Sequence, residues 1–207
     1  MKKIWKGIDI SKHNTITDWD QVAQNVDFVI MRAGGNYDGF YKDSKFERNY
    51  DACKLRNIPV GAYYDCGKKF MEADFGKRCA QHFIRLLSGK QFEYPIYMDI
   101  EVTPAQYKKY ITEASVAFCS EMEEAGFYAG IYASDISGFK ERLILEKVKQ
   151  FTFWVARYGA QPSYVKKYAI WQHSSKGSIP GIKGPVDLDT SFVDFEKAIR
   201  GCHLNGY

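Results

Sequence analysis

Two carboxylates stand one residue apart at the end of an apolar segment. In IYMDIE, residues 96–101, the only charged residues are Asp99 and Glu101. Successive side chains of a β-strand point to opposite faces, so Asp99 and Glu101 share a face if this segment is a strand. Two carboxylates on one face repel each other and resist burial, so the pair gives a strand no structural benefit. The pattern therefore indicates chemistry rather than packing.

Hydrolysis of a glycosidic bond is a reaction that uses such a pair. One carboxyl group carries a proton for the leaving oxygen, while the other stays ionised to stabilise positive charge or to act as nucleophile. Neighbouring acids push their pKa values apart, which separates the two roles. Glu101 has the longer side chain and stands at the strand tip, so we predict it as the general acid. Asp99, one pleat deeper, is predicted to stabilise the developing charge.

Segments of strand and helix character alternate along the chain. Strand-like segments cover residues 6–11, 26–34, 58–65, 94–101, 127–133, 151–158, 168–174 and 184–189. Helices are predicted at 17–25, 43–57, 71–89, 111–126, 137–150 and 191–200. This alternation predicts parallel βαβ units, and eight strands are the number that closes a packed barrel. We expect one α/β domain over residues 1–207, with an open doubly wound sheet as the alternative.

Acidic residues also stand in the first and last predicted strands. Asp9 lies in the first strand and Asp187 in the last. Since a closed barrel makes these strands neighbours, we expect both acids to join Asp99 and Glu101 at one end of the barrel. Asp65 and Asp189 are interpreted as turn or cap residues, and Thr17 as the N-cap of the first helix.

Composition excludes several function classes. The chain is 45% apolar and 16% aromatic, with a net charge of +4 spread without a basic stripe, which argues against nucleic-acid binding. Its five cysteines lack paired Cys or His spacing, so no disulfide framework, metal site or cofactor is expected. The start, MKKIWKGIDIS, lacks the apolar core of a secretion signal, and no stretch approaches the ~20 apolar residues of a membrane span.

An ordered set of short motifs resembles glycoside hydrolase family 25, the Chalaropsis-type lysozymes. The motifs run over nearly the whole chain: GIDIS (7–11), ITDWDQV (16–22), DFVIMRAG (27–34), FERN (46–49), PVGAYY (59–64), YMDIE (97–101), GIYAS (130–134), WVARY (154–158), IWQHSSKGSIPGI (170–182) and VDLD (186–189). Each motif alone is weak. Their order and intervals together make the resemblance specific.

The resemblance implies an irregular TIM-like barrel, with five βα units followed by three strands that largely lack helices. It implies an acidic cluster of Asp9, Asp99, Glu101 and Asp187, with Glu101 as proton donor and with retention of anomeric configuration. Asp9 and Asp187 would hold hydrogen-bond networks and tune the pKa values of the pair. Whether Asp99 attacks the sugar or orients the N-acetyl group of the substrate stays open.

The family's cleft is lined by aromatic residues. Tyr63, Tyr64, Tyr132 and Trp171 stand at matching strand ends, so we expect them to stack on sugar rings. Trp154 fits this lining and core packing about equally well.

Other positions fit the family less closely. Arg32, near the end of the second strand, is expected to pair with the acids. The family usually has Asn in place of Asp189 and Tyr in place of His173. We interpret Asp189 as the cap of the helix at 191–200, and His173 as a residue of the cleft side or the surface.

The implied substrate is bacterial peptidoglycan, cut at the β-1,4 bond between N-acetylmuramic acid and N-acetylglucosamine. We expect action on the cell wall, with release by phage lysis or another route, or with a signal removed, and no wall-binding domain in these residues. The alternatives are a glycan-binding module that does not cut and a chitinase-like N-acetylglucosaminidase. A metal-dependent deacetylase would need His ligands beside its acids, and the four His residues form no such pair.

Overall fold

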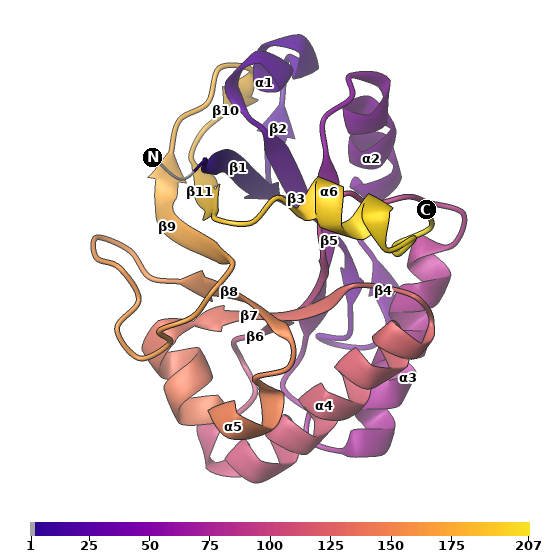
Figure 1. Ribbon diagram of the computed structural model, residues 1–207, viewed down its shortest axis with the longest axis vertical. Coiled ribbons are helices and arrows are strands. Elements are labelled where there is room, and N and C mark those ends of the chain that lie inside the picture. The colour runs from indigo at the N-terminus through magenta and orange to yellow at the C-terminus, as the bar shows by residue number, and fades with distance from the viewer. Residues whose placement is uncertain (1–2) are drawn as a thin grey trace.

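Eight strands close into a barrel in the computed structural model, which describes residues 3–207 (Figure 1). In chain order they are β1 (Trp5–Ile10), β3 (Phe28–Gly35), β5 (Val60–Cys66), β6 (Ile96–Ile100), β7 (Ala129–Ser134), β8 (Thr152–Ala156), β9 (Ile170–Gly177) and β11 (Val186–Ser191). The barrel closes because β1 pairs with β3 on one side and with β11 on the other. The expectation of a closed barrel is thus confirmed, and the open sheet is excluded.

The barrel mixes parallel and antiparallel strands. The run from β1 through β3, β5, β6, β7 and β8 to β9 is parallel, whereas β11 is antiparallel to both of its neighbours, β9 and β1. Three two-residue strands lie outside this ring: β2 (Thr15–Ile16), β4 (Tyr41–Lys42) and β10 (Ile182–Lys183). The antiparallel connection from β9 to β11 needs no crossover helix. The parallel strands β8 and β9 are joined by a loop without a helix.

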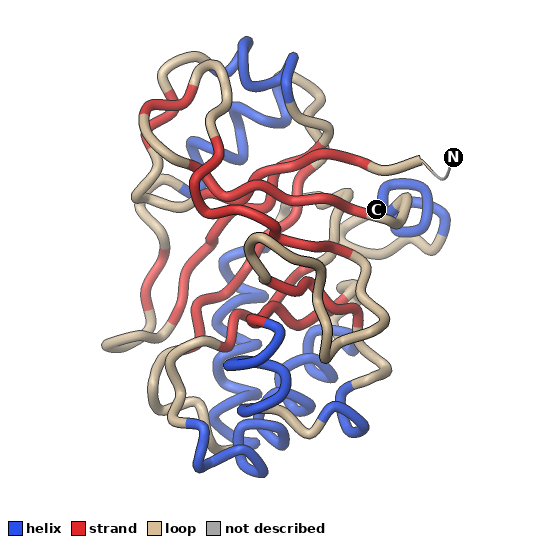
Figure 2. The backbone as a smooth tube through the Cα atoms, turned by 90° about the vertical axis from the view of Figure 1, so that its left-hand side faces the viewer, coloured by secondary structure: helices blue, strands red, loops and turns tan. Residues whose placement is uncertain are grey.

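Helices cover much of the outside of the barrel, as Figure 2 shows in blue beside the red strands, and α6 lies across one end. They are α1 (Trp19–Asn25), α2 (Phe46–Leu55), α3 (Ala73–Leu87), η1 (Ala105–Tyr107), α4 (Lys108–Glu124), η2 (Asp135–Lys140), α5 (Leu145–Val148) and α6 (Phe195–Gly201). The strands β1, β3, β5, β6 and β7 are each followed by helical structure before the next barrel strand, β8 and β9 are not, and the short α6 follows β11, so the predicted division into five βα units and three strands that largely lack helices is confirmed. Within residues 3–207, no helix has the length and apolar character to cross a membrane.

Strand alternation separates two buried clusters. Side chains such as Met31, Tyr64 and Met98 point outward and pack under the helices. Phe28, Tyr97 and other inward side chains fill the barrel, where Phe195 of α6 joins them near the start of β6. This interior packing blocks one end of the barrel, so a ligand can reach inward residues only from the end where the parallel strands finish.

Three local predictions need correction. Residues 137–150 form η2 and the single-turn α5 rather than one helix. Asp18, not Thr17, caps α1, because its Oδ1 accepts from the backbone N–H groups of Asp20 and Gln21. The last helix begins at Phe195 under the cap of Asp194, and β11 extends to Ser191, the first residue assigned to that helix.

Candidate active site

An acidic pocket of about 190 Å³ opens where the parallel strands end. Its lining combines four carboxylates with an amide and four aromatic rings: Asp9, Tyr63, Asp99, Glu101, Tyr132, Trp154, Tyr158, Gln172 and Asp187. All four acids predicted as the catalytic cluster therefore lie in one pocket. They come from three separate parts of the chain, β1, the end of β6 and β11, so the barrel is what brings them together.

Two register relationships place the acids. Asp9 lies directly opposite Asp187 where β1 and β11 pair, as expected for a closed barrel. Asp99 lies one residue before the end of β6, and Glu101 follows the last strand residue. Asp99 is buried and Glu101 is exposed at the rim, so the pair has one deep and one accessible carboxyl group.

Both members of the Asp99–Glu101 pair hold their protons more tightly than ordinary carboxyl groups. Burial raises the pKa of Asp99 well above its usual range, and the charges of Glu101 and Asp65 raise it further. Desolvation in the cleft also raises the pKa of Glu101, helped by the charges of Asp65 and Asp187 and opposed by Arg142. A carboxyl group with a raised pKa keeps the proton that a general acid must donate.

Gln172 organises one side of the pocket. Its Nε2 donates to Asp9 Oδ2 at 2.7 Å, and its Oε1 accepts from the hydroxyl groups of Tyr132 and Tyr158, both at 2.9 Å. Burial raises the pKa of Asp9 well above its usual range, and the charges of Asp189 and Asp187 add to this. The amide thus uses both ends to fix an acid and two phenols.

Asp189 lies inside the barrel rather than at the helix, which corrects the interpretation as a cap. It is only 1% exposed, and Trp154 Nε1 donates to its Oδ1 at 2.8 Å. Burial raises the pKa of Asp189 to about 8. Since Asp187 and Asp189 are two residues apart on β11, they share the inward face. Burial also raises the pKa of Asp187.

Strand alternation divides the predicted sugar-stacking residues. Tyr63 and Tyr132 point inward and line the acidic pocket, together with Trp154. Tyr64 points outward, is fully buried, and its hydroxyl lies 3.0 Å from His82 Nδ1 under α3. A ring with no exposed surface cannot stack on a sugar, so the prediction for Tyr64 is wrong.

Trp171 is also separated from the acids. It alternates with Gln172 on β9, so its ring lies on the opposite face, where Nε1 donates to the carbonyl of Arg157 at 2.8 Å. The ring of His173 meets that of Trp171 edge to face, and partial burial lowers the pKa of His173. Trp171 therefore does not line the acidic pocket.

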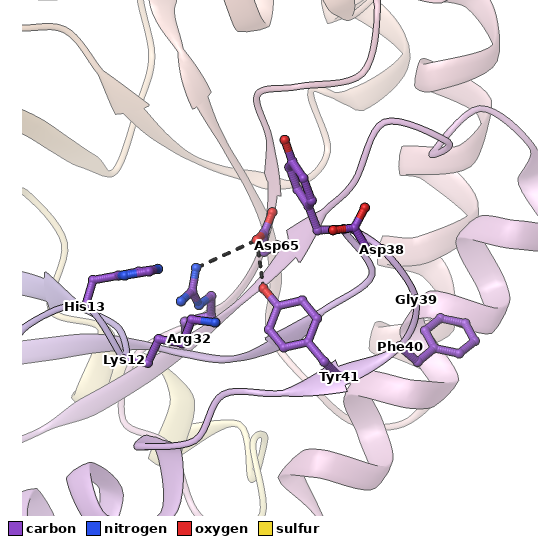
Figure 3. Close-up of a pocket in the computed structure, with 9 residues that line it drawn as sticks. Lys12, His13, Arg32, Asp38, Gly39, Phe40, Tyr41 and Asp65 are labelled. Atoms are coloured by element: carbon purple, nitrogen blue, oxygen red, sulfur yellow. Dashed lines mark hydrogen bonds and ion pairs between the residues drawn. The ribbon is translucent and has the colours of Figure 1, made fainter.

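Arg32 does not pair with the four acids but with two others. Its Nε donates to Asp43 Oδ2 at 2.8 Å, and its Nη1 lies 3.7 Å from Asp65 Oδ2, which also accepts from the hydroxyl of Tyr41. These contacts lie in a second pocket of about 500 Å³ beside the ends of β1, β3 and β5. Figure 3 shows Lys12, His13 and Arg32 on one side of this pocket and Asp38, Gly39 and Phe40 on the other.

Sequence reasoning missed Gln172 and Tyr158, and it left Trp154 undecided. Gln172 is 2% exposed, although Gln residues are mostly found on protein surfaces. The available signal for Gln172 was a polar residue at a strand position whose side chain points into the barrel. Within residues 3–207, no group of three or more His, Cys, Asp or Glu side chains has an arrangement that could hold a metal ion.

Comparison with known proteins finds a matching family and a curated relative. The family model described as Glycosyl hydrolases family 25 matches residues 8–182. The autolytic lysozyme of Clostridium acetobutylicum is 28% identical over 186 residues, which are 89% of this chain and 55% of that protein. The chain thus spans about half the length of this curated relative.

Solved structures share the fold. The CTP1L endolysin is 27% identical, with a TM-score of 0.81 over 95% of this chain and 70% of that one. The catalytic domain of endolysin ply40 from bacteriophage P40 of Listeria monocytogenes is 23% identical, with a TM-score of 0.80 over 97% of this chain and 99% of that one. Because the family model matches most of its length, the chain belongs to glycosyl hydrolase family 25.

Proposed function

We propose that this barrel is a lysozyme that hydrolyses the β-1,4 bond between N-acetylmuramic acid and N-acetylglucosamine in bacterial peptidoglycan. The observation that carries the proposal is the pairing of Asp99 and Glu101 in one pocket of a family 25 chain, one carboxyl buried and the other at the rim. The relative from Clostridium acetobutylicum, an autolytic lysozyme, supports the substrate class.

In the proposed reaction, Glu101 donates its proton to the glycosidic oxygen as the bond from that oxygen to the anomeric carbon breaks. Positive charge then develops on the ring. Asp99 in its ionised form stabilises it, either by bonding to the anomeric carbon or by orienting the N-acetyl group that does so. When Glu101 carries its proton, its charge no longer raises the pKa of Asp99, which favours ionised Asp99 beside protonated Glu101. Water next attacks the anomeric carbon as the bond from that carbon to Asp99 or to the N-acetyl oxygen breaks, and Glu101 takes up one proton of the water, which restores the starting state.

We further propose that the reaction retains the anomeric configuration. Asp99 and Glu101 stand on one face of one strand, separated by a single residue, which favours the short carboxyl separation of about 5 Å that retaining enzymes use. Tyr63 and Tyr132 would contact the sugar rings, and Asp9 and Asp187 would hold polar groups around them.

We also propose that the partner is the bacterial cell wall and that this single barrel cleaves it without a further domain. Digestion of purified peptidoglycan tests both points. Fragments are reduced with borohydride and identified by mass spectrometry, with Glu101→Gln as the control. Fragments ending in reduced N-acetylmuramic acid support the proposal. Fragments ending in reduced N-acetylglucosamine reject the bond assignment, and binding without fragments favours a glycan-binding module.

A further inference from the structure

Asp189 occupies an unusual position for a carboxylate. It is buried inside the barrel opposite Gly7 of β1, with Oδ1 bonded to Trp154 Nε1. Its Oδ2 is also buried, and within residues 3–207 no N–H or O–H group donates to it. A buried acceptor without a donor costs about 1–3 kcal/mol. The side chain therefore needs an explanation beyond packing.

Asp9 and Asp189 are diagonal neighbours on the inward face where β1 pairs with β11, because Asp9 lies two residues after Gly7, the residue opposite Asp189. The interaction between the two carboxyls raises the pKa of Asp9. The other contacts of the two groups are similar, since each accepts one N–H, from Gln172 in the case of Asp9 and from Trp154 in the case of Asp189. Two ionised carboxylates have no proton to donate to each other. Their contact becomes a hydrogen bond only if one proton lies between them.

The surroundings supply no positive charge that would let both groups ionise. Within the described chain, no Lys or Arg forms an ion pair with Asp9 or Asp189, and Arg32 is already paired with Asp43 and Asp65. The titratable groups that face the two carboxyls from neighbouring strands are acids and phenols: Asp99, Asp187, Tyr63, Tyr97, Tyr132 and Tyr158. A second negative charge here would be buried without a counter-ion.

We propose that Asp9 and Asp189 share one proton at neutral pH, and that Asp189 is a positioning residue that holds Asp9 in place through this bond. The inference rests on the proposed function, because Asp9 is taken to face the substrate. The shared proton leaves the two groups with one negative charge. It also gives Asp9 a second hydrogen-bonding partner besides Gln172, so that the acid, the amide and Tyr132 keep one arrangement.

The directions of the pKa shifts agree with this geometry. Burial raises the pKa of Asp189 to about 8, and it raises the pKa of Asp9 well above the usual range. Because the two groups interact strongly, the proton belongs to the pair rather than to either residue.

Two substitutions separate the proposed role from simple packing. In Asp189→Asn, the amide Nδ2 donates permanently to Asp9, while Oδ1 still accepts from Trp154. In Asp189→Ala, both contacts are lost. Asp194→Asn is the matched control, because Asp194 is the exposed cap of α6 just after β11 and Asn caps helices equally well.

A carboxyl-carbon NMR titration of the full chain tests proton sharing without using activity. In the wild type, the Asp9 and Asp189 signals are expected to titrate together and to report one bound proton through neutral pH. In Asp189→Asn, the pKa of Asp9 is expected to fall, because a fixed N–H donor stabilises its charged form. The proposal would be overturned if both Asp9 and Asp189 were already ionised at mildly acidic pH. It would also be overturned if the pKa of Asp9 were the same in Asp189→Asn as in the wild type.

Kinetics on peptidoglycan tests the positioning role. Loss of a group that orients a site residue typically costs about 10- to 100-fold in activity, so Asp189→Ala is expected to lower kcat by this factor with little change in KM. Asp189→Asn should restore most of the rate, and Asp194→Asn should match the wild type. Equal rates for Asp189→Ala and wild type, or no rescue by Asn, would contradict it. If the wild type cuts no peptidoglycan, the proposed function is refuted. The NMR titration still shows whether Asp9 and Asp189 share one proton.

Discussion

Asp65 lies beside Asp99 where β5 and β6 pair, although only Asp99 lines the acidic pocket. Asp65 is held by the hydroxyl of Tyr41 at 2.7 Å and by Arg32. From this position its charge raises the pKa of both Asp99 and Glu101, adding to the effect of burial. A carboxylate outside the pocket therefore helps to keep protons inside it.

Replacing this charge should shift the pH dependence of the reaction. In Asp65→Asn, we expect the pKa of Glu101 to fall, so the proton donor is lost at lower pH. The alkaline limb of kcat/KM against pH should move to lower pH, while the rate on the acidic side changes little. The control is Asp38→Asn. Asp38 is exposed and lines the second pocket, on the side away from Arg32 in Figure 3, so its replacement should leave the alkaline limb of kcat/KM unchanged.

Removal of the proton donor should abolish turnover but not folding. General acid catalysis contributes about 100- to 10,000-fold, so Glu101→Gln is expected to lose at least that much of kcat. Because Glu101 is exposed at the rim, its replacement should leave the unfolding transition unchanged. Rates, denaturation curves and glycan binding measured on the same preparation check this. Near-normal turnover would remove Glu101 from the mechanism.

Gln172 should matter for both stability and rate. In Gln172→Ala, Asp9 loses a donor and Tyr132 loses its acceptor inside the barrel. A buried polar group left unpaired costs about 1–3 kcal/mol, so the free energy of unfolding should fall by at least this amount. Urea denaturation measures the loss. Gln172→Glu is the informative comparison, because its new charge would face Asp9 and should raise the pKa of that carboxyl further.

The buried acids should make stability decline as pH rises. Asp189 has an ordinary pKa of 3.8 and a folded pKa of about 8, so the folded protein binds this proton more tightly than the unfolded chain does. Its stabilising contribution is complete below the ordinary pKa and is lost as pH rises toward the folded value. The unfolding free energy of the wild type, relative to Asp189→Asn, should therefore fall across this range and then level off. If the unfolding free energies of the wild type and Asp189→Asn changed with pH in parallel, the raised folded pKa of Asp189 would be contradicted.

Tyr63 and Tyr64 form an internal comparison between the two faces of β5. Tyr63 lines the acidic pocket, so Tyr63→Ala should raise KM for glycan as stacking is lost. Tyr64→Phe removes only a hydroxyl next to His82 under α3 and should leave the kinetics unchanged. Initial rates over a range of glycan-chain concentrations measure both effects. A higher KM in Tyr64→Phe alone would mean that the outer face of β5 reaches the substrate.

The barrel could be predicted because local patterns repeat. Apolar strands, helices of crossover length and a count of eight strands together favour a closed α/β barrel, and only the pairing of β1 with β11 excludes an open doubly wound sheet. The last strand was harder to delimit. Asp is a residue type that often caps helices, so Asp189 could be taken for the cap of the last helix. The structure shows that Asp194 caps α6 and that Asp189 is still part of β11.

The acids of the site could be predicted, but their partners could not. Asp9, Asp99, Glu101 and Asp187 follow from their places in strands. The hydrogen bond between Gln172 and Asp9 joins residues 163 positions apart, which no local pattern reveals. Tyr64 failed for a simpler reason: adjacent residues on a strand point to opposite faces, and the sequence pair Tyr63-Tyr64 does not say which one points inward.

The pairing of β1 with β11 has a consequence for biosynthesis. The acidic pocket needs Asp9 from the first strand of the barrel and Asp187 from the last. A nascent chain can form its early βα units while it is still being made, but one side of the pocket is missing until β11 emerges. The growing barrel is therefore expected to lack a complete acidic pocket until its first and last strands meet.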